Sequence, residues 1–320
     1  MSEKLLDVQD CRTYFFTHRG IVKAVDGVSF NVKQGESVGL VGESGCGKTV
    51  TCLSILRLVP LPGKIMGGSV YFKGENLLGN EKRIKEVRGA EISMIFQDPL
   101  SSLNPLIKVG DQVAEVIRVH HGLDKKEAWD KAVRMIESVG ISESEERAKQ
   151  YPFQFSGGMR QRIMIAIALS CRPDLLIADE PTTNLDVTIQ AQIIESIKKI
   201  REETNTSLLL ITHNLSLIAW LCSKVNVMYA GKIFEQGSVK SIFKNPINPY
   251  TRALFRTIPR VDTDIERLES IKGNVPDLIN VPRGCRFYPR CLEATEICSK
   301  REPQLTEVEP GHFVRCFLRK

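Results

Sequence analysis

The chain has 320 residues, enough for one large domain and a smaller one with a sizeable buried core. Hydrophobic residues make up 42% and charged residues 26%, proportions that are ordinary for a soluble globular protein. The net charge of +6 is spread along the chain, so it permits nucleic acid or an anionic membrane as a partner without requiring either. No apolar run approaches the roughly 18–20 residues of a membrane span, and the start "MSEKLLDVQD" lacks the apolar segment of a secretory signal. We therefore expect a cytosolic polypeptide.

The N-terminal third predicts strands around one helix. Residues 5–41 predict short strands, and "ESVGLVG" is an apolar run ending in glycine, as in a buried strand before a phosphate loop. Residues 50–58 predict a helix, and "GGSVYFKGENL" predicts an edge strand followed by a turn. "AEISMIFQDP" predicts a further strand that ends at Gln97.

From about residue 105 to residue 170 the apolar residues recur with a helical period. "KKEAWDKAVRMIESVG" predicts a helix that ends at Gly140. Its apolar face, which we interpret as core packing, consists of Trp129, Ala132, Val133, Ile136 and Val139. "LLIAD" and "SLLLITH" then predict two buried strands with a helix between them, which favours a mainly parallel sheet covered on both faces. Sequence rich in proline, basic residues and turns follows, so we place a domain boundary near residue 240.

The stretch "GESGCGKT", Gly42–Thr49, matches the phosphate-loop pattern G-x-x-x-x-G-K-[ST] between a predicted strand and a predicted helix. Its glycines let backbone N–H groups curl around an anion, Lys48 can reach the β- and γ-phosphates, and the Thr49 hydroxyl can hold Mg²⁺. The nucleotide is therefore expected to contact Gly42, Glu43, Ser44, Gly45, Cys46, Gly47, Lys48, Thr49 and Val50.

Three further polar residues follow predicted strands. Asp179 and Glu180 end the apolar run of "LLIADEP": the first is placed to bind Mg²⁺ and the second to orient and polarise an attacking water. His213 ends "SLLLITH" and could contact the γ-phosphate. Paired with a phosphate loop, these residues favour ATP hydrolysis.

A second phosphate-type segment, "FSGGMRQR", places Ser156, Gly157 and Gly158 before a basic helix. A helix N-terminus offers backbone N–H groups to a phosphate. The alternative is that these residues only cap their own helix.

As an ordered set, the phosphate loop, Gln97, the S-G-G segment, the Asp-Glu pair, "NLD" (residues 184–186) and His213 resemble the ATPase subunit of an ABC transporter. The resemblance implies a P-loop NTPase fold with a RecA-like parallel core, an antiparallel β subdomain and a helical subdomain over about residues 100–170, together filling residues 1–240. Such domains pair head to tail, so that the S-G-G segment of one closes over nucleotide held on the loop of the other.

The resemblance also implies individual roles. Gln97 resembles the glutamine that senses Mg²⁺ and the membrane subunit, and Asp186 resembles the aspartate of the D-loop. His213 is similar to the switch histidine, so the catalytic set is Lys48, Gln97, Glu180 and His213. Phe15 is expected to stack on adenine, with Tyr14 as the second choice.

The sequence departs from the usual signature L-S-G-G-Q, because it has Phe155 and Met159 at the ends of "FSGGM". Met159 cannot form the hydrogen bond that glutamine would. The D-loop has Asn184 where alanine is common.

Four stretches, "FQDPLSSLNP", "FSGGMRQRIMIA", "NPYTRAL" and "GCRFYPRC", narrow the resemblance to the dipeptide and oligopeptide importer ATPases, in particular the first of their two non-identical ATPase subunits. This group implies a prokaryotic protein at the cytoplasmic face of the membrane. The implied partners are a second, homologous ATPase, two transmembrane permease subunits and, indirectly, an extracytoplasmic peptide-binding protein. A nickel importer of the same group is one alternative. A soluble ABC-type ATPase acting on nucleic acid or ribosomes is another, but only the net charge supports it, and no nucleic acid is expected.

The C-terminal extension, residues 241–320, carries four of the nine cysteines with the spacing C-x5-C-x6-C-x17-C. Four thiolates suit tetrahedral zinc or an iron–sulfur cluster, and the absence of a C-x2-C pair counts against a zinc ribbon. The resemblance implies a [4Fe–4S] cluster on Cys285, Cys291, Cys298 and Cys316, with zinc as the alternative. The site could be a structural staple or a sensor that governs the ATPase.

Overall fold

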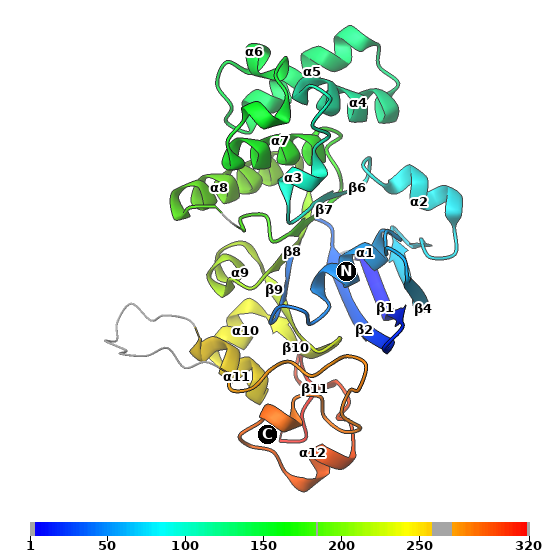
Figure 1. Cartoon of the computed structure of the whole chain (residues 1–320). Helices are drawn as coiled ribbons and strands as arrows, with labels where there is room; N and C mark the ends of the chain where they lie inside the picture. Colours follow the sequence, from blue (N-terminus) through cyan, green and yellow to red (C-terminus); the bar gives the residue numbers. More distant parts are fainter. Residues whose placement is uncertain (1–3, 184, 258–270, 319–320) are drawn as a thin grey trace. The chain divides into compact units, whose positions relative to one another are not determined.

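The computed structural model describes residues 4–183, 185–257 and 271–318, without the side chains of Leu100 and Val187. Asn184 lies outside these residues. The chain divides into two compact units (Figure 1). The first consists mainly of residues 80–209, and the second consists mainly of residues 4–32, 36–79 and 210–320.

The second unit contains an antiparallel sheet with the strand order β2-β1-β4-β5. Its strands are β1 (Lys4–Thr17), β2 (Gly20–Lys33), β4 (Gly63–Phe72) and β5 (Glu75–Asn76). The prediction of short strands is wrong here, since β1 and β2 have 14 residues each. Irregular pairing of β1 with β4 around residues 9–13 interrupts the alternation that the sequence pattern would show. The edge assignment is also wrong, because β4 lies between β1 and the two-residue β5.

The same unit holds a second group of strands that carries the phosphate loop. The fully buried β3 (Ser37–Val41) pairs in parallel with β9 (Lys224–Tyr229), and α1 (Lys48–Ile55) follows the loop. The sheet continues beyond β9 with β10 (Lys232–Ser238), β12 (His312–Val314) and β11 (Thr306–Glu309). Each of these strands pairs antiparallel with the one before it. The C-terminal segment therefore extends the sheet that contains β3.

Helices complete the second unit. They are α9 (Leu215–Leu221), α10 (Val239–Lys244), α11 (Pro249–Arg256), the 3₁₀ turn η2 (Tyr288–Arg290) and α12 (Glu296–Lys300). The turn η2 lies in the short loop between Cys285 and Cys291.

The first unit pairs β6 (Ile92–Ile95) in parallel with β7 (Leu175–Asp179). The strand predicted to end at Gln97 thus ends two residues earlier. The remaining strand, β8 (Ser207–Thr212), is fully buried and runs from the first unit into the second. Parallel pairing and fully buried strands confirm the predicted parallel core.

The helices of the first unit are α2 (Glu81–Val87), α3 (Pro99–Ser102), α4 (Val109–His121), α5 (Lys125–Ser138), α6 (Ser144–Ala148), the 3₁₀ turn η1 (Pro152–Gln154), α7 (Gly157–Leu169) and α8 (Val187–Thr204). On α5, Ala132 and Ile136 are buried, as is Val139 just beyond it, so that face packs in the core. Within the described residues, no helix combines the length and the apolar character that crossing a membrane requires.

Candidate functional site

The phosphate loop between β3 and α1 has a backbone that only glycine permits at two positions. Gly42 has φ 155° and Gly47 has φ 105°. A Cβ on Gly42 would lie 2.1 Å from the carbonyl oxygen of Met228, and one on Gly47 would lie 2.1 Å from that of Ala24. The loop is thus wrapped against neighbouring backbone, which fixes its curvature.

Lys48 begins α1 and is 6% exposed. Its Nζ donates to the carbonyl oxygens of Gly42 at 2.7 Å and Glu43 at 3.1 Å, so its charge is held against the loop itself. Ser44, Gly45 and Thr49 are exposed, and Val50 is half-buried. The buried Cys46 has its pKa raised by desolvation, which keeps it a neutral thiol.

The aromatic residues of β1 have separate environments. Phe15 is half-buried and shares a strand face with Thr13, whose hydroxyl is 2.7 Å from that of Ser54 on α1. Tyr14, on the opposite face, donates to Asp26 at 2.6 Å. Burial and this hydrogen bond raise the pKa of Tyr14 to about 12. Phe15 stays the predicted adenine contact with Tyr14 as the second choice, because the hydrogen bond engages the Tyr14 hydroxyl and not the face of its ring.

The acidic pair lies in the first unit. Asp179, the last residue of β7, is 1% exposed, and Glu180 follows with a left-handed φ of 47°. The Glu180 carboxylate accepts a hydrogen bond from the Thr183 hydroxyl at 2.9 Å and one from the Gln97 amide at 3.5 Å. The structure thus brings together Gln97 and Glu180, which are 83 residues apart in the sequence. His213 is exposed, directly after β8.

The S-G-G segment forms the N-terminus of α7. Ser156 is the N-cap, and its hydroxyl accepts from the Met159 backbone N–H at 3.3 Å. A Cβ on Gly158 would lie 2.8 Å from Ile189 of α8, so this glycine permits the two helices to approach. Ser156 and Gly157 are exposed, whereas Phe155 is 2% exposed and anchors the segment in the core. Capping of its own helix therefore occurs, and the contact with a partner's nucleotide stays a prediction.

Asp186 has a similar local role. It is the N-cap of α8, where its Oδ1 accepts from the Ile189 backbone N–H at 2.9 Å. Its predicted D-loop function stays a prediction.

One contact of the phosphate loop was not predicted. Arg290 donates to both carboxylate oxygens of Glu43, at 2.7 and 2.9 Å, and to the hydroxyl of Tyr229 at 3.2 Å. The backbone N–H of Glu43 donates to the hydroxyl of Tyr250 at 3.0 Å. Arg290 belongs to "GCRFYPRC" and Tyr250 to "NPYTRAL", so two of the four stretches that narrow the sequence resemblance contact the loop.

The segment between Cys285 and Cys291 makes two further contacts, one with β2 and one with the turn between β9 and β10. Arg286, 4% exposed, forms an ion pair with Asp26 and donates to the carbonyl oxygen of Ala230. Burial alone would raise the pKa of Asp26, but the hydrogen bond from Tyr14 and the charges of Lys232 and Arg286 lower it.

Phe287 adds an apolar contact to these ion pairs. Its ring packs against Tyr229 and Tyr250, with 5.3 Å between ring centroids in each case. Aromatic pairs at this separation add stability beyond the area they bury. The segment is therefore held by both charge and packing.

The four C-terminal cysteines all line one small cavity of about 20 Å³. The Leu318 backbone N–H donates to the Cys316 sulfur at 3.3 Å, and Cys285 and Cys291 accept from Phe287 and Glu293 in the same manner. Burial raises the pKa of Cys285 to about 11. Among the described residues no group of three His, Cys, Asp or Glu side chains is arranged to hold a metal ion.

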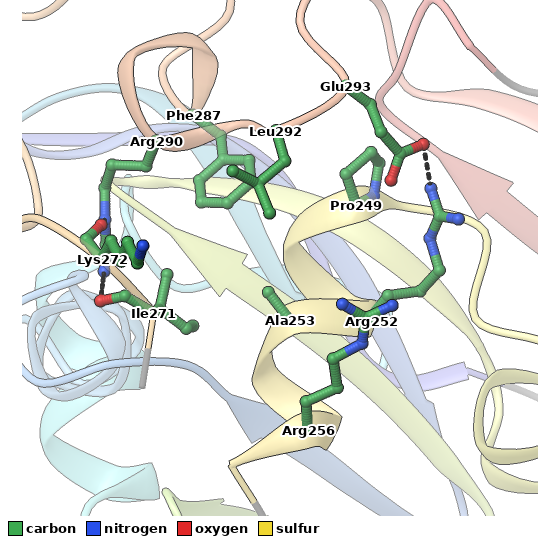
Figure 2. A pocket seen from close by; sticks show the side chains of 10 residues that line it. All are labelled: Pro249, Arg252, Ala253, Arg256, Ile271, Lys272, Phe287, Arg290, Leu292 and Glu293. Atoms are coloured by element: carbon green, nitrogen blue, oxygen red, sulfur yellow. Dashed lines mark hydrogen bonds and ion pairs between the residues drawn. The ribbon is translucent and has the colours of Figure 1, made fainter. Parts of the chain in front are cut away.

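A larger cavity of about 420 Å³ lies beside Arg290 (Figure 2). Its wall includes Phe287, Leu292 and the ion pair between Arg252 and Glu293, whose N···O distance is 2.6 Å. Arg290 also donates to the backbone carbonyl of Lys272 at 3.0 Å there.

Comparison with known proteins places these features in a family. The family model described as ABC transporter matches residues 25–183, and the one described as oligopeptide/dipeptide transporter, C-terminal region, matches residues 234–298. The chain is 49% identical to the oligopeptide transport ATP-binding protein AppD of Bacillus subtilis, over 98% of this chain and 96% of that protein. It is 47% identical to the oligopeptide transport ATP-binding protein OppD of Escherichia coli, over 99% and 94%. It is 48% identical to the dipeptide transport ATP-binding protein DppD of Bacillus subtilis, over 99% and 95%.

Solved structures show the same fold. The ATP-binding cassette MJ0796, a dimer bound to ADP and phosphate, superposes with a TM-score of 0.66 and 24% identity, over 73% of this chain and 98% of that chain. The protein cbiO1 from Clostridium perfringens, part of an ABC transporter complex, gives a TM-score of 0.63 at 24% identity, over 76% and 92%.

Proposed function

We propose a function from the family of this chain, which belongs to the oligopeptide and dipeptide ABC-transporter ATP-binding proteins. The chain hydrolyses ATP to energise the import of di- or oligopeptides across the cytoplasmic membrane. The observation that carries this proposal is near-full-length identity of 47–49% to three peptide-transport ATP-binding proteins, which includes the C-terminal region. No specific observation favours the nickel or nucleic-acid alternatives.

The proposed chemistry is in-line attack of water on the γ-phosphate, in which catalysis comes from positioning and charge stabilisation. Lys48, held at the loop, stabilises charge on the β- and γ-phosphates, and His213 contacts the γ-phosphate. Glu180, fixed by Thr183 and Gln97, orients the water.

Magnesium fits the oxygen donors of this chain. Carboxylate, amide and hydroxyl oxygens are the ligands that Mg²⁺ prefers, and we propose that Asp179, Gln97 and Thr49 hold it. When bound, the ion neutralises negative charge on the β- and γ-phosphates.

The proposed working unit is a head-to-tail pair of ATPase subunits, the second being a different, homologous chain. Ser156, Gly157 and Gly158 contribute backbone N–H groups to nucleotide on the partner's loop, and Asp186 lies at the same interface. MgATP closes the pair, and the surface around Gln97 transmits this closure to two permease subunits at the cytoplasmic face of the membrane. An extracytoplasmic binding protein delivers the peptide.

The test is reconstitution of the chain with its companion ATPase, two permease subunits and binding protein in lipid vesicles. We expect ATP-dependent uptake of a labelled tripeptide, and no uptake when Glu180→Gln replaces the wild-type chain. ATP-dependent accumulation of Ni²⁺ without peptide uptake would assign the chain to nickel import instead.

We also propose that Cys285, Cys291, Cys298 and Cys316 hold a [4Fe–4S] cluster, with zinc as the alternative. The donor set supports the cluster, because four thiols line one cavity and the sulfurs of three of them accept hydrogen bonds from backbone N–H groups. A cluster binds each thiolate through a different iron, so its ligands need not converge on a single point. The cavity is about 20 Å³, so the thiols must move apart to admit it. Absorbance near 400 nm that dithionite bleaches, with iron in the metal assay, is the expected result; a colourless, zinc-loaded chain would refute the cluster.

A further inference from the structure

The phosphate loop contains one acidic side chain, Glu43, in a segment built to bind a polyanion. A carboxylate beside phosphates repels them, and the repulsion is strong where burial limits solvent screening. The Glu43 side chain is 25% exposed and its partner Arg290 is 5% exposed, so the ion pair is only partly screened. The negative charge of Glu43 must therefore be neutralised by a cation before the loop can bind phosphate tightly.

Arg290 has the geometry for that neutralisation. Its two terminal nitrogens donate to the two oxygens of Glu43 at 2.7 and 2.9 Å, which is the bidentate arrangement that fixes a carboxylate in orientation as well as charge. The same guanidinium lies 5.7 Å from the ring centroid of Tyr229 and donates to the backbone carbonyls of Ile271 and Lys272. Figure 2 shows the Arg290 side chain extended beside these two residues.

The position of Arg290 depends on the cysteine segment. It precedes Cys291 directly and ends η2, whose start is held by the edge-to-face contact of Phe287 with Tyr229 and its tilted contact with Tyr250. Cys285 and Cys291, at the two ends of this segment, both line the cysteine cavity. A shift of the cysteine site would therefore move Arg290 relative to Glu43.

We propose that Arg290 is a positioning residue for MgATP, which neutralises and orients Glu43 in the phosphate loop and so links nucleotide affinity to the C-terminal cysteine segment. This role rests on the proposed binding of MgATP by the loop. This role explains why the cysteine segment, which is distant from the phosphate loop in the sequence, carries an arginine that contacts the loop. Tyr250, which accepts the Glu43 N–H, supports the same residue from the backbone side.

The experiment measures Kd for a fluorescent ATP analogue with Mg²⁺, by equilibrium titration of the full chain. Arg290→Met leaves Glu43 uncompensated, so we expect Kd to rise about tenfold or more, with a smaller penalty at high ionic strength. Arg290→Lys keeps the charge and loses the bidentate contact, so its Kd should be intermediate. The double variant Glu43→Gln/Arg290→Met should bind within about threefold of wild type, since the repulsion is gone. Arg252→Met, which loses an exposed ion pair on the same cavity, should bind as wild type does.

Each outcome is decisive. Recovery in the double variant supports neutralisation, because damage to the fold of the C-terminal segment would persist when Glu43 changes. Failure of that recovery, or wild-type affinity in Arg290→Met, overturns the proposed role of Arg290. Absence of MgATP binding by the wild-type chain would instead refute the proposed function.

Discussion

The side-chain amide of Gln97 donates to the carboxylate of Glu180 at 3.5 Å, and the hydroxyl of Thr183 donates to the same oxygen at 2.9 Å. Glu180 also has a left-handed φ of 47°, a conformation that is uncommon for a non-glycine residue and costs free energy. Two hydrogen bonds and a constrained backbone therefore orient this carboxylate.

We expect Glu180→Gln to bind MgATP like the wild-type chain and to lower ATP turnover by about 10²- to 10⁴-fold, because the amide cannot polarise water. Gln97→Ala should cause a smaller loss, since Thr183 still holds the carboxylate. Turnover in the assembled complex and nucleotide affinity of the isolated chain are the measurements. Glu195→Gln, on the exposed surface of α8, serves as the control and should match wild type. Substantial turnover in Glu180→Gln would show that another group activates the water.

Local patterns predicted the position of the loop between β3 and α1 and the end of β7 at Asp179, but they placed the end of β6 two residues too late. The glycine pattern of Gly42–Thr49 and the apolar run that ends at Asp179 each lie within a single stretch, which carries the information. The curvature at Gly42 and Gly47 also needs the backbone of Met228 and Ala24, which no local pattern reveals. The parallel core was predictable from local patterns, since buried strands between helices leave few alternatives.

Contacts between distant stretches could not be predicted. Glu43 and Arg290 are 247 residues apart, so no local pattern relates them. The sequence signal was present as two arginines between Cys285 and Cys291, but a loop rich in basic residues reads as a solvated surface. Their targets, Asp26 and Glu43, are identified only by the folded structure.

Ser156→Arg should leave nucleotide binding by the isolated chain largely unchanged and abolish cooperative hydrolysis in the assembled complex. Ser156 is exposed at the start of α7, where a long cation would occupy the surface proposed to meet the partner's nucleotide. The lost N-cap costs only about 1 kcal/mol, so the fold should persist. Asp124→Arg removes the exposed N-cap of α5 in the same unit and is the matched control for that cost. Unchanged turnover in the Ser156→Arg complex would reduce the segment to a helix cap.

Disturbing the cysteine site should weaken nucleotide binding through Arg290. Cys291→Ser alters the residue next to Arg290, so we expect Kd for MgATP to rise about fivefold or more while thermal unfolding stays cooperative. Cys171→Ser, at a buried cysteine of the first unit, should leave Kd unchanged. If both variants bind MgATP equally well, the C-terminal cysteines act only as a structural staple.

Asp26→Asn should lower the free energy of unfolding by about 3 kcal/mol, because it leaves the buried guanidinium of Arg286 without its carboxylate. The folded pKa of Asp26 is lower than its ordinary value near 4, so its stabilising charge is fully present above that value and is lost as the pH falls through the folded pKa. The stability difference between wild type and Asp26→Asn should therefore be constant from about pH 8 to about pH 5 and shrink below about pH 4. Urea unfolding across this range measures it, with Asp130→Asn on the exposed face of α5 as the control. A difference that grows on acidification would mean that Asp26 is protonated in the folded chain and does not hold Arg286 by charge.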